Sequence, residues 1–265
     1  SETTYVGNED LTAPMKVEAI LRGGLVVQEA DAGEEVGVIT DKTPFYAESG
    51  GQVGDTGSLH SLQAGKLAAE DVLIEITDTQ WLDKYVLHIG KIKKGRVTGG
   101  QTLEGAVDAE RRMAITRNHT ATHLLQNALR TVIGPHIEQA GSLVGPDRFR
   151  FDFSHFTPLA PEEIRKIEDM VNRRVRENGR VTKTVTTLDD AKKQGALAFF
   201  GDKYGEKVCL VKVADYSREL CGGLHLDETG QIGYFRILSD SSIAAGTRRI
   251  EATTGAAAVK EARED

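Results

Sequence analysis

Residues able to bind a metal ion occur in this sequence as two pairs with the same spacing. His119 is followed by His123 after four positions, and Cys221 is followed by His225 after four positions. On a helix, residues i and i+4 stand on the same face, so the first pair can share one ion. Together the pairs offer imidazole nitrogens and a thiolate sulfur, which suit a tetrahedral zinc. The sequence therefore predicts a zinc site built from these residues.

Either pair alone would be weak support for a metal site. An isolated pair of histidines at this spacing is more often solvated or satisfied in a core, and a lone cysteine usually behaves as a small buried hydrophobe. Between Cys221 and His225, however, stand Gly222 and Gly223. Glycine allows close approach of the backbone. Two pairs at matched spacing, one of them beside a double glycine, favour the metal interpretation.

Length and charge limit the function classes. The chain has 265 residues, a net charge of −7 and only Cys209 and Cys221 as cysteines. It contains no apolar run near the ~20 residues of a membrane helix. The small cysteine count indicates a reducing compartment, and with no signal-peptide pattern we expect a cytoplasmic protein without membrane contact. Because the sequence starts without Met, we expect an excised fragment. The negative charge argues against a general nucleic-acid binder.

The first part of the chain has the pattern of a small β-barrel. Short β-branched runs separated by turn residues occur at 17–21, 25–30, 35–40, 72–77, 86–89 and 102–107. This spacing predicts a barrel-like module over residues 1–107. Within it, residues 50–57 contain four glycines, the first two followed by Gln52. The segment lacks the pattern of a nucleotide-phosphate loop, so we interpret it as a tight turn with bulges.

From Asp108 the hydrophobic period becomes helical. Asp108 can cap a helix reaching about residue 133, with His119 and His123 at the edge of its apolar stripe. Strands are expected at 141–144 and 149–153, and Pro161 can begin a second helix.

The last third of the chain alternates strands with short helices. The expected elements are strands at 181–187, 208–213, 232–238 and 248–253 and a short helix at 189–194. Cys221 and His225 fall in a glycine-rich connection between two of these strands. We therefore predict an α+β fold in which residues 108–265 form a two-layer core, with helices packed on an antiparallel sheet.

Several stretches resemble one known family. They are TPFYAESGGQ at 43–52, RNHTATH at 117–123, FDFSH at 151–155, AFFGDKYG at 198–205, ELCGGLH at 219–225 and RRIEA at 248–252. In this order they resemble the editing region of alanyl-tRNA synthetase and, in part, the free-standing proteins that hydrolyse mischarged alanine tRNA. The likeness spans nearly the whole chain. Where this chain has Leu224, the family normally has Thr.

The resemblance implies an activity and a set of residues. The implied reaction is hydrolysis of the ester joining serine or glycine to the 3′ end of alanine tRNA. By position, His119, His123, Cys221 and His225 would hold zinc, while Thr122, Gln139 and Arg248 would line the aminoacyl pocket. The implied partners are the acceptor end of mischarged tRNA(Ala) and the rest of the synthetase.

Three interpretations stay open on the sequence alone. Besides the tRNA editing esterase, the same residue pairs resemble the metal-free editing site of threonyl-tRNA synthetase. A non-catalytic RNA-binding module with a structural zinc is the third. Four protein ligands usually mark a structural zinc, whereas a catalytic zinc keeps one open position. Either one of the four residues dissociates from the metal or does not coordinate it, so that a water can bind there, or the metal only orients the substrate.

Two further expectations concern recognition of the substrate. Arginines near the proposed cleft should form a local positive patch for the tRNA; these are Arg111, Arg112, Arg117 and Arg248. Thr122 could read the hydroxyl of serine, which size alone cannot separate from alanine. Its alternative role is a hydrogen bond back to its own helix.

Overall fold

The computed structural model describes residues 2–62, 71–197 and 205–264. The chain divides into two compact units. Unit 1 comprises Ser1–Ser49 and Val53–Arg112, and unit 2 comprises Gly50–Gln52 and Met113–Asp265. The AFFGDKYG stretch lies outside the described residues except for its last glycine. No helix in the described ranges is long and apolar enough to cross a membrane.

Unit 1 contains the predicted barrel. Among its described residues, six antiparallel strands close into a ring in the order β2, β11, β7, β8, β9 and β5, because β11 pairs with both β2 and β7. The strands are β2 (Thr12–Arg22), β5 (Glu35–Thr40), β7 (Gly57–Ser61), β8 (Leu73–Leu82), β9 (Tyr85–Lys94) and β11 (Thr102–Val107). The α+β class and the barrel were thus correctly predicted.

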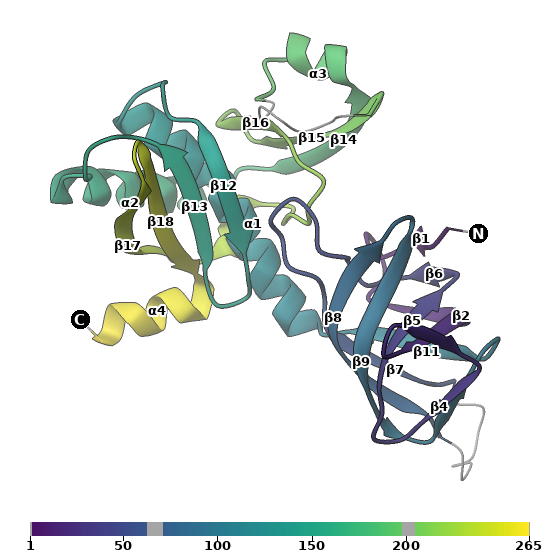
Figure 1. Cartoon of the computed structure of the whole chain (residues 1–265). Helices are drawn as coiled ribbons and strands as arrows, with labels where there is room; N and C mark the ends of the chain where they lie inside the picture. Colours follow the sequence, from purple (N-terminus) through teal and green to yellow (C-terminus); the bar gives the residue numbers. More distant parts are fainter. Residues whose placement is uncertain (1, 63–70, 198–204, 265) are drawn as a thin grey trace. The chain divides into compact units, whose positions relative to one another are not determined.

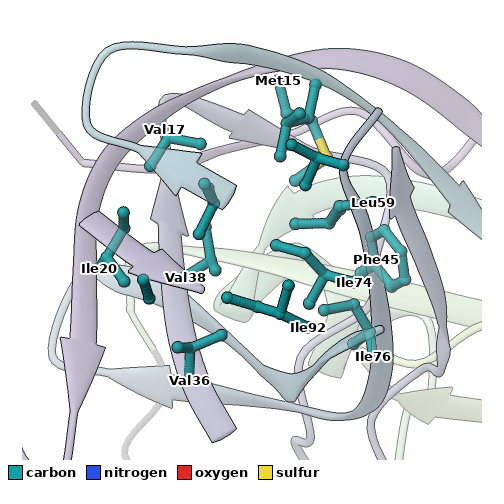
Figure 2. Close-up of a cluster of buried hydrophobic side chains, with 14 of the residues drawn as sticks. Met15, Val17, Ile20, Val36, Val38, Phe45, Leu59, Ile74, Ile76 and Ile92 are labelled. Atoms are coloured by element: carbon teal, nitrogen blue, oxygen red, sulfur yellow. The ribbon is translucent and has the colours of Figure 1, made fainter. Parts of the chain in front are cut away.

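Alternating side chains fill the interior of the barrel. Met15 and Val17 on β2, and Ile74 and Ile76 on β8, are buried while their chain neighbours face outward. Successive side chains of a strand point to opposite faces, so each strand contributes every second residue to the core. Figure 2 shows these side chains converging with Phe45 and residues of β5, β7 and β9.

One expected strand of unit 1 is divided. Residues 25–30 form β3 (Leu25–Val27) and β4 (Glu29–Asp31). The reason is a change of partner: β3 pairs with β2, whereas β4 pairs with β10 (Arg96–Thr98). The short strands β1 (Thr4–Tyr5) and β6 (Lys42–Thr43) form a separate parallel pair.

Unit 2 is the α+β part of the chain. One antiparallel sheet has the order β12, β13, β18 and β17, and a second has the order β14, β15 and β16 (Figure 1). Their strands are β12 (Gln139–Val144), β13 (Phe149–Ser154), β14 (Val181–Thr187), β15 (Lys207–Val213), β16 (Ser217–Leu220), β17 (Phe235–Ala244) and β18 (Thr247–Thr254). The helices are α1 (Ala109–Val132), α2 (Pro161–Arg176), α3 (Leu188–Lys193) and α4 (Gly255–Glu264).

Helices pack on the first sheet, as predicted. On α2, the amide of Asn172 bonds both the carbonyl oxygen and the N–H of Phe235 in β17, at 2.8 and 2.9 Å. On α1, Asn118 donates to the carbonyl of Gly145 at 2.8 Å and accepts from Thr254 at 2.7 Å. Between these contacts, buried phenylalanines alternate along β13. The helix that carries the histidine pair is therefore fixed to this sheet.

The strand expected at 232–238 begins later than predicted. Thr229–Ile232 forms the short 3-10 helix η1, and β17 starts at Phe235. Gly233 between them has a φ of 74°, a left-handed conformation that favours glycine. The apolar residue Ile232 is buried, which explains why it looked like part of a strand.

Candidate metal centre

The two ligand pairs come together in unit 2. His119 and His123 lie on α1, while Cys221 and His225 lie in the connection that follows β16. One ligand atom from each residue lies within 4.8 Å of all the others. The three histidines are more than nine-tenths buried. The grouping predicted from the spacing is present.

The donor distances fit a metal ion. Cys221 Sγ lies 3.4 Å from His119 Nε2 and 3.2 Å from His225 Nε2. Ligand atoms around a tetrahedral zinc, bound at about 2.1 Å by nitrogen and 2.3 Å by sulfur, lie roughly 3.3 to 3.8 Å apart. The two distances from Cys221 are thus close to those around a zinc ion, and the nitrogen and sulfur donors of the cluster match that ion.

The proton on His225 can be assigned from its neighbours. The hydroxyl of Thr120 donates to the carbonyl of Thr116 at 2.9 Å, so its single proton is used. The oxygen then accepts from the N–H of Leu226 at 3.1 Å and contacts His225 Nδ1 at 3.4 Å. Nδ1 must therefore carry the proton. This leaves the lone pair of Nε2 facing Cys221.

His123 has a carboxylate behind it. Its Nδ1 lies 2.9 Å from Glu219 Oε2, an ion-pair distance without the alignment of a hydrogen bond. Glu219 is itself held by the hydroxyl of Ser217 at 2.5 Å. Such a carboxylate behind a histidine orients the ring for metal binding. The sequence-based prediction did not include Glu219 or Thr120, although each stands within two residues of a predicted ligand.

The protonation states of Cys221 and His225 favour metal binding. Burial by itself would raise the pKa of the Cys221 thiol, but the nearby His119 and His225 lower it well below its ordinary value. Burial, together with His119, lowers the pKa of His225 to about 3. Burial lowers the pKa of His123, but Glu219 and Cys221 outweigh it and raise that pKa. A thiolate at Cys221 and a neutral imidazole at His225 are forms that ligate metals, whereas His123 must release a proton to bind one.

Gly223 is required by the packing of the cluster. A Cβ atom at this position would overlap ring atoms of His119 and lie 2.9 Å from Gln52 Oε1. A Cβ atom at Gly222 would meet nothing within 4 Å. Of the double glycine noted in the sequence, the second one allows the approach to His119.

The residues expected to line the aminoacyl pocket are held as follows. Thr122 is buried on α1, where its hydroxyl donates to the carbonyl of Asn118 at 2.9 Å. Gln139 and Arg248 lie in one row across the sheet, because both are in register with Phe153. Gln139 also contacts the hydroxyl of Ser142 at 3.4 Å. Thr122 thus makes the hydrogen bond to its own helix that was the alternative interpretation.

The expected arginine patch is wrong for two of its members. Arg248 is buried and makes two hydrogen bonds with Asp240, at 2.7 and 2.8 Å. Arg112 is buried against Asp55 and the carbonyls of Gly7 and Pro44. Because their charges are neutralised inside the protein, neither is available to a phosphate. Sequence alone does not show these acidic partners.

A groove of about 640 Å³ lies next to the ligand connection in unit 2. It is lined by Arg180, Val181, Thr182, Lys183, Asp227, Glu228 and Gln231. Arg117 borders it, donating to the carbonyl of Gln231 at 3.1 Å. The groove therefore reaches Asp227, two residues beyond His225, and its lining combines the basic side chains of Arg180 and Lys183 with the carboxylates of Asp227 and Glu228.

Comparisons with known proteins agree with the sequence motifs. Residues 1–111 match the family model described as tRNA synthetases class II (A), and residues 208–251 match the threonyl and alanyl tRNA synthetase second additional domain. An alanine–tRNA ligase from Acetivibrio thermocellus is 48% identical over 265 residues, covering 100% of this chain. The enzyme from Methylococcus capsulatus is 46% identical over 257 residues, or 97% of the chain. In both cases the chain spans 29% of the length of the relative.

Proposed function

Because the chain belongs to the alanyl-tRNA synthetase family, we propose that it is an editing hydrolase for alanine tRNA mischarged with serine or glycine. The observation that carries the proposal is the set of buried donors in unit 2. Nδ1 of His225 contacts the hydroxyl of Thr120, so it is not available to a metal. Nε2 of both His119 and His225 faces the sulfur of Cys221. In a cluster that only stabilises the core, the lone pairs on these nitrogens and on the sulfur would be expected to accept hydrogen bonds from neighbouring donors and not to face one another.

The proposed reaction is hydrolysis of an ester. Water adds to the acyl carbon, the bond from that carbon to the ribose oxygen breaks, and the ribose oxygen takes up a proton. The products are a free amino acid and uncharged tRNA. A zinc ion held by His119, His123, Cys221 and His225 would supply positive charge that polarises or orients the acyl group.

The chain's own side chains would position the substrate. The hydroxyl of Thr122 donates its proton to the carbonyl of Asn118, so the Thr122 oxygen can only accept a further hydrogen bond. The hydroxyl of a serine substrate can donate to it. Gln139 offers an amide that can donate or accept. Arg248 is fixed by Asp240, so we assign it to shaping the pocket floor and not to binding phosphate.

The groove beside the ligand connection is the proposed path of the tRNA end. Arg180 and Lys183 line it, and Arg117 lies at its border. Basic side chains bind phosphates through charge and release of counterions. We propose that the acceptor end lies along this groove, and that the remaining parts of a full-length synthetase contribute the rest of the tRNA contact.

Deacylation assays test this function. We expect the chain to hydrolyse seryl-tRNA(Ala) and glycyl-tRNA(Ala) faster than alanyl-tRNA(Ala), and to lose this activity with a zinc chelator. Full activity in chelator with no bound metal would support the metal-free threonyl type. Loss of fold on chelation without any hydrolysis by the zinc form would support a non-catalytic RNA-binding module.

A further inference from the structure

We propose that Gln52, the glutamine of the glycine-rich motif, is a positioning residue of the metal centre. Its side-chain oxygen holds the ring of His119 with Nε2 turned toward the metal position. The inference deepens the proposed function at the same site and rests on it for the presence of a metal. It gives a role to a motif whose function its own sequence did not reveal.

Gln52 contacts both ligand-bearing segments of unit 2. Its side chain is completely buried. Its Oε1 lies 2.7 Å from His119 Nδ1 on α1 and 2.9 Å from the backbone nitrogen of Leu224. One amide oxygen thus joins the helix that carries the first ligand pair to the connection that carries the second.

The backbone of Leu224 determines how the Gln52 amide is turned. A backbone N–H can only donate, so the atom that it contacts must be an acceptor. The side-chain nitrogen of glutamine is a donor and would repel this N–H. The oxygen of Gln52 must therefore face Leu224, as the structure has it.

The orientation of the amide in turn fixes the proton on His119. The same Oε1 lies against His119 Nδ1, and an amide oxygen has only lone pairs to offer. Nδ1 must therefore carry the proton, which leaves the lone pair on Nε2. That nitrogen is the one 3.4 Å from Cys221 Sγ. Gln52 thus selects the tautomer of His119 that can bind the metal shared with Cys221.

The glycines of the motif hold Gln52 in place. The carbonyl of Gly51 accepts from the N–H of Val144 in β12 at 2.7 Å, and Gln52 forms a bridge with the same residue. Gly51 has a φ of 83°, and a Cβ atom there would lie 2.6 Å from the carbonyl oxygen of Ser142. Only glycine allows this approach. The motif is therefore a support for Gln52, which the interpretation as a simple turn did not foresee.

Each histidine of the cluster then has its own partner at Nδ1. His225 has Thr120, His123 has Glu219, and His119 has Gln52. Removing such an outer partner from a metal ligand typically weakens metal binding about 10-fold to 100-fold. Gln52 differs from the other two because the same atom also restrains the connection that carries Cys221 and His225.

Two substitutions separate this role from simple packing. Gln52→Met keeps the length and volume of the side chain but offers no oxygen to His119 or Leu224. Gln52→Glu keeps an oxygen for both and places a carboxylate behind His119, as Glu219 stands behind His123. The nitrogen that Glu lacks has no partner among the described residues, so its loss removes no bond.

Binding of Co²⁺ to the metal-free chain tests the inference. The affinity and the visible spectrum of the cobalt complex would be measured for wild type, Gln52→Met and Gln52→Glu, with thermal unfolding to confirm that each is folded. We expect Gln52→Met to bind Co²⁺ about 10-fold to 100-fold more weakly with an altered spectrum, and Gln52→Glu to match or exceed wild type. Equal affinity of Gln52→Met and wild type would overturn the inference, as would Gln52→Glu binding as weakly as Gln52→Met.

The test also separates this inference from the proposed function. Deacylation of seryl-tRNA(Ala) by wild type, measured in parallel, reports on the function alone. If wild type is inactive but the cobalt affinities follow the expected order, the positioning role stands and the editing function fails. If wild type is active but Gln52→Met binds cobalt normally, the function stands and the positioning role fails. A wild-type chain that binds no cobalt would contradict the inference outright.

Discussion

Buried histidines occur in both units of the molecule, but their nitrogens are used differently. In unit 1, His88 is fully buried, with Nδ1 2.8 Å from the carbonyl of Val38 and Nε2 2.7 Å from the hydroxyl of Thr43. A carbonyl can only accept, so Nδ1 donates and Nε2 accepts. Both nitrogens are satisfied within the barrel. In unit 2, by contrast, His119 and His225 each bond outward through Nδ1 and turn Nε2 toward Cys221.

This difference separates a histidine with a purely structural role from one that is able to bind a metal. Burial alone does not, because His88 is as buried as any histidine of the cluster. What matters is whether a lone pair is left over after the neighbouring groups have been satisfied. In the barrel none is left on His88. In unit 2 the remaining lone pairs meet at one point, together with a thiol.

Among the variants that test this difference, removal of a candidate metal ligand should have the largest effect on zinc content and deacylation. We expect Cys221→Ala and His123→Ala to lose zinc and to reduce deacylation of seryl-tRNA(Ala) to background, while unit 1 stays folded. The matched control is Cys209→Ala, which removes the other thiol and should leave zinc content and activity intact. Zinc analysis and deacylation rates check this. Undiminished hydrolysis by Cys221→Ala would show that the site lies elsewhere.

Acid should destabilise the barrel through His88. Burial lowers the pKa of His88 to about 4, from an unfolded value of 6.5. Between these pH values the unfolded chain binds a proton that the folded barrel excludes, so the stability of unit 1 falls as pH drops from about 6.5 to about 4. The difference of 2.5 units corresponds to about 3 kcal/mol at full effect.

Urea unfolding at several pH values measures this loss. Trp81 lies on β8 and is the only tryptophan in the sequence, so its fluorescence reports on unit 1. The variant His88→Gln cannot titrate and should show a flatter dependence on pH, even if it is less stable overall. The same slope in wild type and His88→Gln would mean that another group is responsible.

A methyl group at one glycine should weaken the metal centre, while the same change at its neighbour should not. Gly223→Ala places a carbon where the ring of His119 lies, so this ring must shift. We expect metal affinity to fall about 10-fold to 100-fold. Gly222→Ala is the control, since its added carbon meets nothing within 4 Å. Competition with a zinc-binding dye would give both affinities, and equal affinities for the two variants would contradict the packing described for Gly223.

Selectivity should change more modestly with the hydroxyl of Thr122. Thr122→Val removes the oxygen proposed to accept from serine, so we expect the preference for seryl-tRNA over alanyl-tRNA to narrow. The rate with glycyl-tRNA should respond less, because glycine has no hydroxyl. Thr131→Val is a matched control. Thr131 lies further along α1, and its hydroxyl likewise donates to the carbonyl four residues earlier, that of Asn127, at 2.8 Å. An unchanged seryl-to-alanyl ratio in Thr122→Val would place the discriminating group elsewhere.

The smallest effect on metal affinity is expected at Leu224, where the family normally has Thr. Leu224 acts on the site through its backbone N–H, which donates to Gln52 whatever the side chain is. Leu224→Thr should therefore leave metal affinity unchanged and deacylation equal or higher. A clear fall in rate would show that the leucine side chain has a role of its own.

The sequence predicted that the four candidate ligands would come together, but not which groups hold them. Helical periodicity placed His119 and His123 on one face, and the matching spacing of Cys221 and His225 completed the set. The partner of His119 could not be foreseen, because Gln52 stands 67 positions earlier in the chain. The pairing of Arg248 with Asp240 was missed for a similar reason. It depends on the register of β17 and β18, which contains irregularities that periodicity does not reveal.

A zinc titration of the metal-free chain tests the central claim most directly. Deacylation of seryl-tRNA(Ala) would be followed as zinc is added in fractions of an equivalent. If the histidine and cysteine cluster is the metal centre of an editing hydrolase, the rate rises from background and levels off at one equivalent of zinc per chain. A rate that is already maximal without zinc, or that stays at background after one equivalent has bound, would contradict it.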